Sequence, residues 1–175
     1  MDFAELIEER HSVRAFEERA VERVVLESIL QAAGRAPSAG NLQAYKVALV
    51  RARSVRRRLA SAALDQGHVA QAPVVLVFLA DALASGVKYG RRGETLYAVQ
   101  DATIACAYAQ LAACDAGLGS CWVGAFHEDQ VRTALGVDRN LRPVALLPLG
   151  YPAQAPEITP RRPQSEMVLE IELGT

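Results

Sequence analysis

Apolar positions along the chain recur with two different spacings, which together predict a succession of helices and strands. A spacing near 3.6 residues, as for Phe3, Leu6 and Ile7, is typical of an amphipathic helix. Alternation, or a short run of β-branched residues, is typical of a strand. Helices are predicted at 2–9, 22–35, 54–64, 95–116 and 128–135. Strands are predicted at 45–50, 72–80, 120–126, 142–149 and 167–173, with an extended proline- and arginine-rich segment at 152–164.

The helix predicted at 95–116 is apolar on nearly all sides. One face carries a stripe of small side chains, Ala98, Ala102, Ala105, Ala109, Ala112 and Ala116. Other positions, including Leu96, Val99, Ile104 and Leu111, are apolar too. A helix of this kind is buried on nearly all sides. It is either a central core helix of a monomer or a helix whose small-residue stripe packs against a second subunit, and in a domain this small we favour the second subunit.

Composition predicts one globular domain and argues against several partners. The chain has 175 residues, of which 51% are apolar, and its net charge of −1 creates no field that would attract nucleic acid or a membrane surface. The one basic cluster, 51–58, lacks interleaved aromatic residues and is expected to be a solvated helix face. The N-terminus does not resemble a secretory signal, and the longest apolar run is too short to span a membrane. We therefore expect a cytoplasmic protein, with Cys106, Cys114 and Cys121 as reduced, buried thiols.

Motifs for catalysis by side chains are scarce. The three histidines, His11, His68 and His127, are scattered, and the chain contains no HExxH, GxSxG, GxGxxG or P-loop pattern. Cys121 lacks the sequence context of a catalytic thiol. We therefore expect no metal site and a cofactor that brings its own chemistry.

Five segments, in order along essentially the whole chain, resemble those of the FMN-dependent nitroreductase family. They are "RHSVRAF" at 10–16, "APSAGNLQ" at 36–43, "LYAVQDATIA" at 96–105 followed by "GLGSCWVGAF" at 117–126, "LPLGYP" at 147–152 and "PRRP" at 160–163. The resemblance implies an α+β fold, a three-layer α/β/α sandwich with a mainly antiparallel central sheet. It also implies an intertwined homodimer that holds two FMN molecules at its interface. Residues 1–175 would form a single FMN-binding domain, with 152–175 as an extended arm reaching the partner subunit.

The resemblance also assigns a phosphate site. Guanidinium groups bind phosphate bidentately, so Arg10, Ser12 and Arg14 are expected to donate to the FMN phosphate. Without the resemblance, the same segment would be interpreted as a solvated connector. His11 is expected to present its backbone to the ribityl chain. Near the C-terminus, Arg161 is the first candidate and Arg162 the second for closing on the same phosphate, the alternative being a solvated charged tail.

The isoalloxazine ring is assigned to three further segments. The cofactor-binding residues implied there are Pro37, Ser38, Ala39 and Asn41 from a loop of the partner subunit, Gln66 at the pyrimidine edge, and Trp122, Val123, Gly124 and Ala125 along the reactive edge. The backbone N–H groups of Gly124 and Ala125 would reach flavin N5 and O4. Gln43 is expected to stabilise the loop. The strand-and-turn at 120–126 could equally serve packing alone, with Trp122 as a core aromatic. Tyr89, Tyr97 and Phe126 are equally plausible as pocket lining and as packing.

The implied activity is that of an NAD(P)H-dependent flavin oxidoreductase. By this reading, NADH or NADPH gives a hydride to flavin N5 and leaves, and a small electron-poor acceptor, a nitroaromatic or a quinone, then takes the electrons in a ping-pong cycle. No side chain needs to act as an acid or base. Two alternatives remain open: a specialised flavoenzyme of the same fold, such as a dehalogenase, a flavin-fragmenting enzyme or a ring dehydrogenase, and a non-enzymatic FMN-binding or sensory protein.

Overall fold

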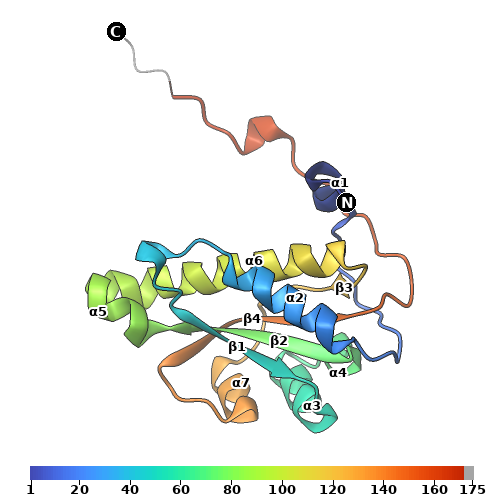
Figure 1. Ribbon diagram of the computed structural model, residues 1–175, viewed down its shortest axis with the longest axis horizontal. Coiled ribbons are helices and arrows are strands. Elements are labelled where there is room, and N and C mark those ends of the chain that lie inside the picture. The colour runs from blue at the N-terminus through green and yellow to red at the C-terminus, as the bar shows by residue number, and fades with distance from the viewer. Residues whose placement is uncertain (172–175) are drawn as a thin grey trace.

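A four-stranded antiparallel sheet, in the order β1–β2–β4–β3, lies between two layers of helices in the computed structural model, which describes residues 1–171 (Figure 1). The strands are β1 (Tyr45–Val50), β2 (Val74–Asp81), β3 (Gly119–Ser120) and β4 (Leu141–Gly150). One face is covered by α2 (Arg23–Gly34) and α6 (Ala98–Asp115). The other is covered by α3 (Arg53–Ala62), α4 (Gly67–Gln71) and α7 (Glu128–Leu135). The remaining elements are α1 (Phe3–Glu9), η1 (Ala39–Asn41), α5 (Ala82–Arg92), the π-helical turn η2 (Gly93–Tyr97) and η3 (Gln164–Glu166).

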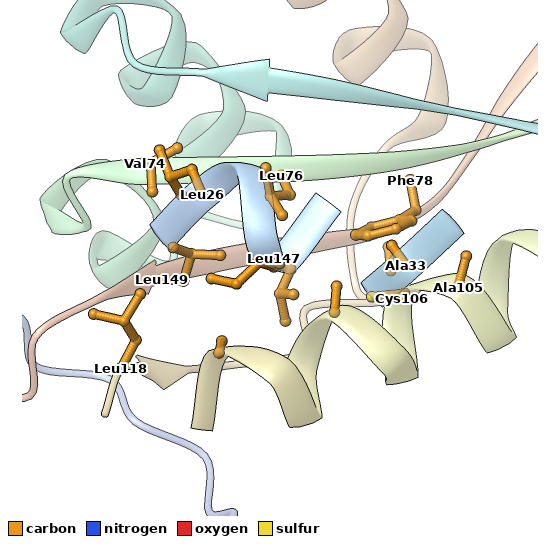
Figure 2. Close-up of a cluster of buried hydrophobic side chains, with 14 of the residues drawn as sticks. Leu26, Ala33, Val74, Leu76, Phe78, Ala105, Cys106, Leu118, Leu147 and Leu149 are labelled. Atoms are coloured by element: carbon orange, nitrogen blue, oxygen red, sulfur yellow. The ribbon is translucent and has the colours of Figure 1, made fainter. Parts of the chain in front are cut away.

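Strand β2 is the centre of the core. Its side chains alternate between the layers: Val74, Leu76 and Phe78 face α2 and α6, as Figure 2 shows, whereas Val75, Val77 and Leu79 pack against α3, α4 and α7. Because helices cover both faces, every position from 74 to 80 is buried. This explains the continuous apolar run in the sequence, which is typical of a strand with no solvated face.

Four of the six alanines in the small-residue stripe lie inside the subunit, so the prediction that this stripe meets a second subunit is wrong. Ala98, Ala102, Ala105 and Ala109 are all fully buried. Figure 2 shows Ala105 on the side of α6 that faces the strands. The physical reason is close packing: small side chains allow α2 and the sheet to approach α6. The exposed side of α6 instead carries Tyr108, with half-buried Ile104, Ala107 and Leu111.

Other predicted elements change in extent. The strand predicted at 120–126 is reduced to the two residues of β3 and a single bridge between Val123 and Leu146. Helices α4 and α5 were not predicted, because one is only five residues long and the other contains two glycines. The strand predicted at 167–173 is absent from 167–171, which are exposed and have no neighbouring strand to pair with, and residues 172 and 173 lie outside the described part of the chain. Among the thiols, Cys106 and Cys121 are buried as expected, but Cys114 is only half-buried.

Candidate functional site

The segment 10–16 runs alongside β3 and is held there by main-chain contacts. Ser12 forms a parallel bridge with Ser120, and the Val13 N–H donates to the Ser120 carbonyl at 2.9 Å. The approach is close because residue 119 is glycine: a Cβ there would lie 2.6–2.8 Å from three side-chain carbons of Val13. The backbone of β3 therefore fixes the position of the "RHSVR" motif.

Ser12 and Arg14 meet Cys121, which directly follows β3. Burial raises the pKa of the Cys121 thiol, while the Arg14 charge and hydrogen bonds with the Ser12 and Arg14 side chains act in the opposite direction. The thiol is therefore a neutral, buried neighbour of two groups that could donate to an anionic ligand. No pattern in the sequence predicts that Cys121 lies beside this motif.

Helix α4 adds two polar side chains to the same end of the sheet. Gln66, its N-cap residue, donates from Nε2 to the Ala125 carbonyl at 3.3 Å. His68 is buried, and its Nε2 has no hydrogen-bond partner within residues 1–171. Burial, followed by the Arg14 charge, lowers the pKa of His68, so the ring is neutral at physiological pH. Buried polar atoms normally have partners, so His68 Nε2 is a candidate for a hydrogen bond with a bound molecule.

We call this group, comprising Ser12, Arg14, Gln66, His68 and Cys121, the polar cluster. The turn after β3 borders it. Val123 is buried and exchanges two backbone hydrogen bonds with Leu146, at 2.9 and 3.0 Å, while Gly124 and Ala125 are exposed. The exposed residues 124 and 125 therefore directly follow a residue that two backbone hydrogen bonds hold in place. Trp122 is half-buried and packs on the α2–α6 core, and a Cβ on Gly124 would lie 3.6 Å from its Nε1.

Arg10 and His11 lie beside the polar cluster rather than within it. They line a cavity of about 250 Å³ together with Val13, Cys114 and Gly119. Arg161 and Arg162 are exposed on the C-terminal arm, which leaves the body of the subunit (Figure 1). The Arg161 guanidinium donates to the Thr159 carbonyl and hydroxyl at 3.2 and 3.1 Å. Within one subunit, only Ser12 and Arg14 of the predicted phosphate residues are brought to the polar cluster.

The predicted ring-contacting loop lies at the other end of the molecule. A cavity of about 490 Å³ is lined by Pro37, Ser38 and Ala39 together with Tyr97, Gln100, Asp101, Thr103 and Ile104. Tyr89 of α5 touches the loop at Gly40, where a Cβ would lie 2.3 Å from its hydroxyl oxygen. Figure 1 shows α5 at one end of the sheet and β3 with α4 at the other, so the loop and the polar cluster are separated within one subunit.

Local hydrogen bonds give the loop its shape. Gln43 Nε2 donates to the Asn41 carbonyl at 2.8 Å, which confirms the prediction that Gln43 stabilises the loop. Asp101 of α6 also contacts the loop and was missed by sequence reasoning. The sequence contained a visible signal for Asp101, a carboxylate within a helix that is apolar on nearly all sides. His68 had no such signal, because nothing in a five-residue helix marks a buried histidine.

Within residues 1–171, no group of three or more His, Cys, Asp or Glu side chains is arranged to hold a metal ion. No helix in this part of the chain has both the length and the apolar character needed to cross a membrane.

The sheet between two helical layers, with a polar cluster at one end and a braced loop of small residues at the other, defines a three-layer α+β protein. The chain belongs to the nitroreductase family: the profile described as "Nitroreductase family" matches residues 7–70 and 64–151. It is 36% identical to an NADH dehydrogenase of Thermus thermophilus over 91% of both chains. It is 30% identical to the oxygen-insensitive NADPH nitroreductase of Salmonella typhimurium, over 95% of this chain and 72% of that one.

A solved structure supports the same assignment. The NADPH:FMN oxidoreductase from Vibrio harveyi complexed with NAD+ superposes with a TM-score of 0.88 at 28% identity, covering 98% of this chain and 78% of that one. The predicted family and the predicted α+β nitroreductase-like fold are therefore confirmed.

Proposed function

We propose that this chain is an FMN-dependent oxidoreductase that takes electrons from NADH or NADPH. Similar proteins include an oxygen-insensitive NADPH nitroreductase, an NADPH-flavin oxidoreductase and an FMN reductase. The observation that carries the proposal is the polar cluster, where a cation, a hydroxyl and an unpartnered buried imidazole nitrogen meet at the place assigned to the flavin. When bound, FMN supplies hydride-accepting chemistry, which no side chain of this chain could provide.

Each part of the polar cluster has a distinct task in this proposal. Arg14 and Ser12 hold the anionic part of the cofactor through charge-assisted hydrogen bonds. Gln66 and His68 offer polar atoms to the cofactor from α4. The backbone N–H groups of the exposed residues 124 and 125 would stabilise negative charge on the ring. The protein therefore binds, orients and electrostatically tunes its cofactor, while no side chain has to transfer a proton.

The finer proposal concerns the reaction cycle. The nicotinamide product leaves before a small electron-poor acceptor, a nitroaromatic or a quinone, enters the same site. The 490 Å³ cavity beside Tyr97, with its largely apolar wall, is suited to a planar aromatic molecule. A ping-pong cycle follows from one site serving both substrates in turn.

A homodimer completes the site in this proposal. The loop and the polar cluster lie at opposite ends of one subunit, so a two-fold axis could place the loop of one subunit over the polar cluster of its partner. The exposed side of α6, with Tyr108 40% accessible, is apolar enough to form the interface. The C-terminal arm adds Ile158, Leu169 and Ile171, which are 76–87% exposed in one subunit and would gain cover from a second.

The test is anaerobic stopped-flow reduction of the FMN-loaded protein by NADH and by NADPH, followed by mixing with a nitroaromatic or a quinone. We expect flavin absorbance to bleach with at least one nicotinamide and to return on adding the acceptor, with parallel lines in double-reciprocal plots. Tight FMN binding without reduction would favour the non-enzymatic alternative. Reduction without turnover of either acceptor would favour a specialised flavoenzyme, and absence of FMN binding would overturn the proposal.

A further inference from the structure

Asp101 is a buried carboxylate that accepts hydrogen bonds from both ends of the loop. It lies in the first turn of α6 and is 2% exposed. Its Oδ1 accepts from the Ala39 N–H at 2.9 Å, and its Oδ2 accepts from the Ala44 N–H at 3.3 Å. A buried carboxylate is costly unless it is hydrogen-bonded, so these two N–H groups account for its presence in an apolar helix.

The main chain between the two N–H groups has an unusual conformation. Gly40, Asn41 and Gln43 have φ angles of 55°, 58° and 49°. These values lie in the left-handed region, which residues other than glycine rarely adopt. A further hydrogen bond joins the two ends of the loop: Ser38 Oγ accepts from the Gln43 N–H at 3.0 Å. Such a conformation persists only when surrounding contacts determine it, and strained segments of this kind concentrate at functional sites.

The two hydrogen bonds to Asp101 lie next to the exposed part of the loop. Pro37 and Asn41 are exposed, and Ser38 and Ala39 are half-buried at the wall of the 490 Å³ cavity, which Asp101 also lines. A displacement of Ala39 or Ala44 would therefore move the surface that the loop presents. Rigid placement of binding groups is what gives a site its affinity, because little conformational entropy is lost on binding.

We infer that Asp101 is a positioning residue: it fixes residues 38–44 in the shape that completes the FMN site of the partner subunit. The inference rests on the proposed function and adds to it a residue that touches no cofactor. Asp101 acts through the main chain of Ala39 and Ala44 and across the subunit boundary. Its loss should therefore damage a site built mostly from the other chain.

The first experiment compares Asp101→Ala and Asp101→Asn with Gln110→Leu, which changes another buried polar side chain of α6 away from the loop. Asp101→Ala removes both acceptors, and we expect about 10–100-fold weaker FMN binding, as for losing hydrogen bonds to a charged group. Asp101→Asn keeps the shape of the side chain and one acceptor oxygen. Its FMN affinity should therefore lie between that of Asp101→Ala and that of the parent. Amide exchange at residues 39 and 44 should accelerate in both Asp101 variants and stay unchanged in Gln110→Leu.

The second experiment uses mixed dimers to test whether Asp101 of one subunit affects the FMN site of the other subunit. A dimer of one Asp101→Ala subunit and one Arg14→Ala subunit has one site with Arg14 and an intact loop, and one site with neither. It should bind one FMN tightly. A dimer of a parent subunit and an Asp101→Ala/Arg14→Ala double variant carries one defect in each site and should bind none tightly. Differently tagged subunits allow both dimers to be purified and titrated with FMN.

The outcomes separate the inference from the proposed function. Parent-like FMN binding in the Asp101 variants, with faster amide exchange in the loop, would overturn the inference and leave the proposed function standing. Equal FMN binding by the two mixed dimers would overturn action across the boundary. Failure of the parent protein to bind FMN would overturn the proposed function itself. Asp101→Asn provides the same comparison if Asp101→Ala does not fold.

Discussion

Gly119→Ala tests whether the contact between β3 and the "RHSVR" segment sets cofactor affinity. The added Cβ would lie 2.6, 2.7 and 2.8 Å from three carbons of Val13. Carbon atoms pack at about 3.5–4.0 Å, so the segment must retreat by roughly 1 Å. That movement carries Ser12 and Arg14 away from the rest of the polar cluster. It also stretches the 2.9 Å hydrogen bond from the Val13 N–H to the Ser120 carbonyl.

The magnitude follows from these contacts. Overpacking of a core costs about 1–3 kcal/mol, and a domain of this size loses about 2–4 °C of Tm per kcal/mol, so we expect a fall of about 2–12 °C. Loss of one charge-assisted hydrogen bond, about 1.5–3 kcal/mol, weakens FMN binding about 10–100-fold. Gly119→Ala removes no polar group, so any loss of FMN affinity results from the displacement of Ser12 and Arg14.

The assay is FMN titration by fluorescence, together with thermal unfolding of the FMN-free protein. Gly34→Ala is the matched control, because a Cβ at Gly34 would meet nothing within 4 Å, and it should leave both values near those of the parent. Val13→Ala in the Gly119→Ala background should restore part of the affinity by removing two of the three overlapping carbons. Parent-like FMN affinity and Tm in Gly119→Ala would refute the reasoning.

Four further outcomes are expected. Arg14→Ala should weaken FMN binding about 10–100-fold, by titration, while the fold is retained in circular dichroism spectra. Ala109→Arg should prevent folding, since it would bury an unpaired charge in the core, whereas Tyr108→Glu should give a folded monomer by light scattering. Folding lowers the pKa of His68 from 6.5, so the unfolded chain binds the proton more tightly than the folded one. The free energy of unfolding should therefore fall as the pH drops below 6.5. In urea unfolding, His68→Gln should make this pH dependence weaker. Truncation after Pro163 should raise the dimer dissociation constant in sedimentation, because it removes the exposed apolar side chains Leu169 and Ile171 of the arm.

Local patterns predicted much of the fold. The short apolar run at 72–80 predicted a strand, and β2 lies there with helices covering both of its faces. The all-round apolar character of 95–116 indicated a helix buried on nearly all sides, and α6 packs against both α2 and the sheet. Both features depend only on the spacing of apolar residues along the chain, which is why the sequence could determine them.

The tertiary structure decided which surfaces and side chains meet. Periodicity shows that α6 has several apolar faces, but the buried one depends on α2, a helix more than 60 residues away in sequence, and so the alanine stripe was assigned to the wrong neighbour. The path of the chain also brings Arg14, His68 and Cys121 together from three separate segments, and it keeps the loop at the opposite end of the subunit. Spacing along the chain is local, whereas these contacts arise from packing between distant elements, so only the folded structure could determine them.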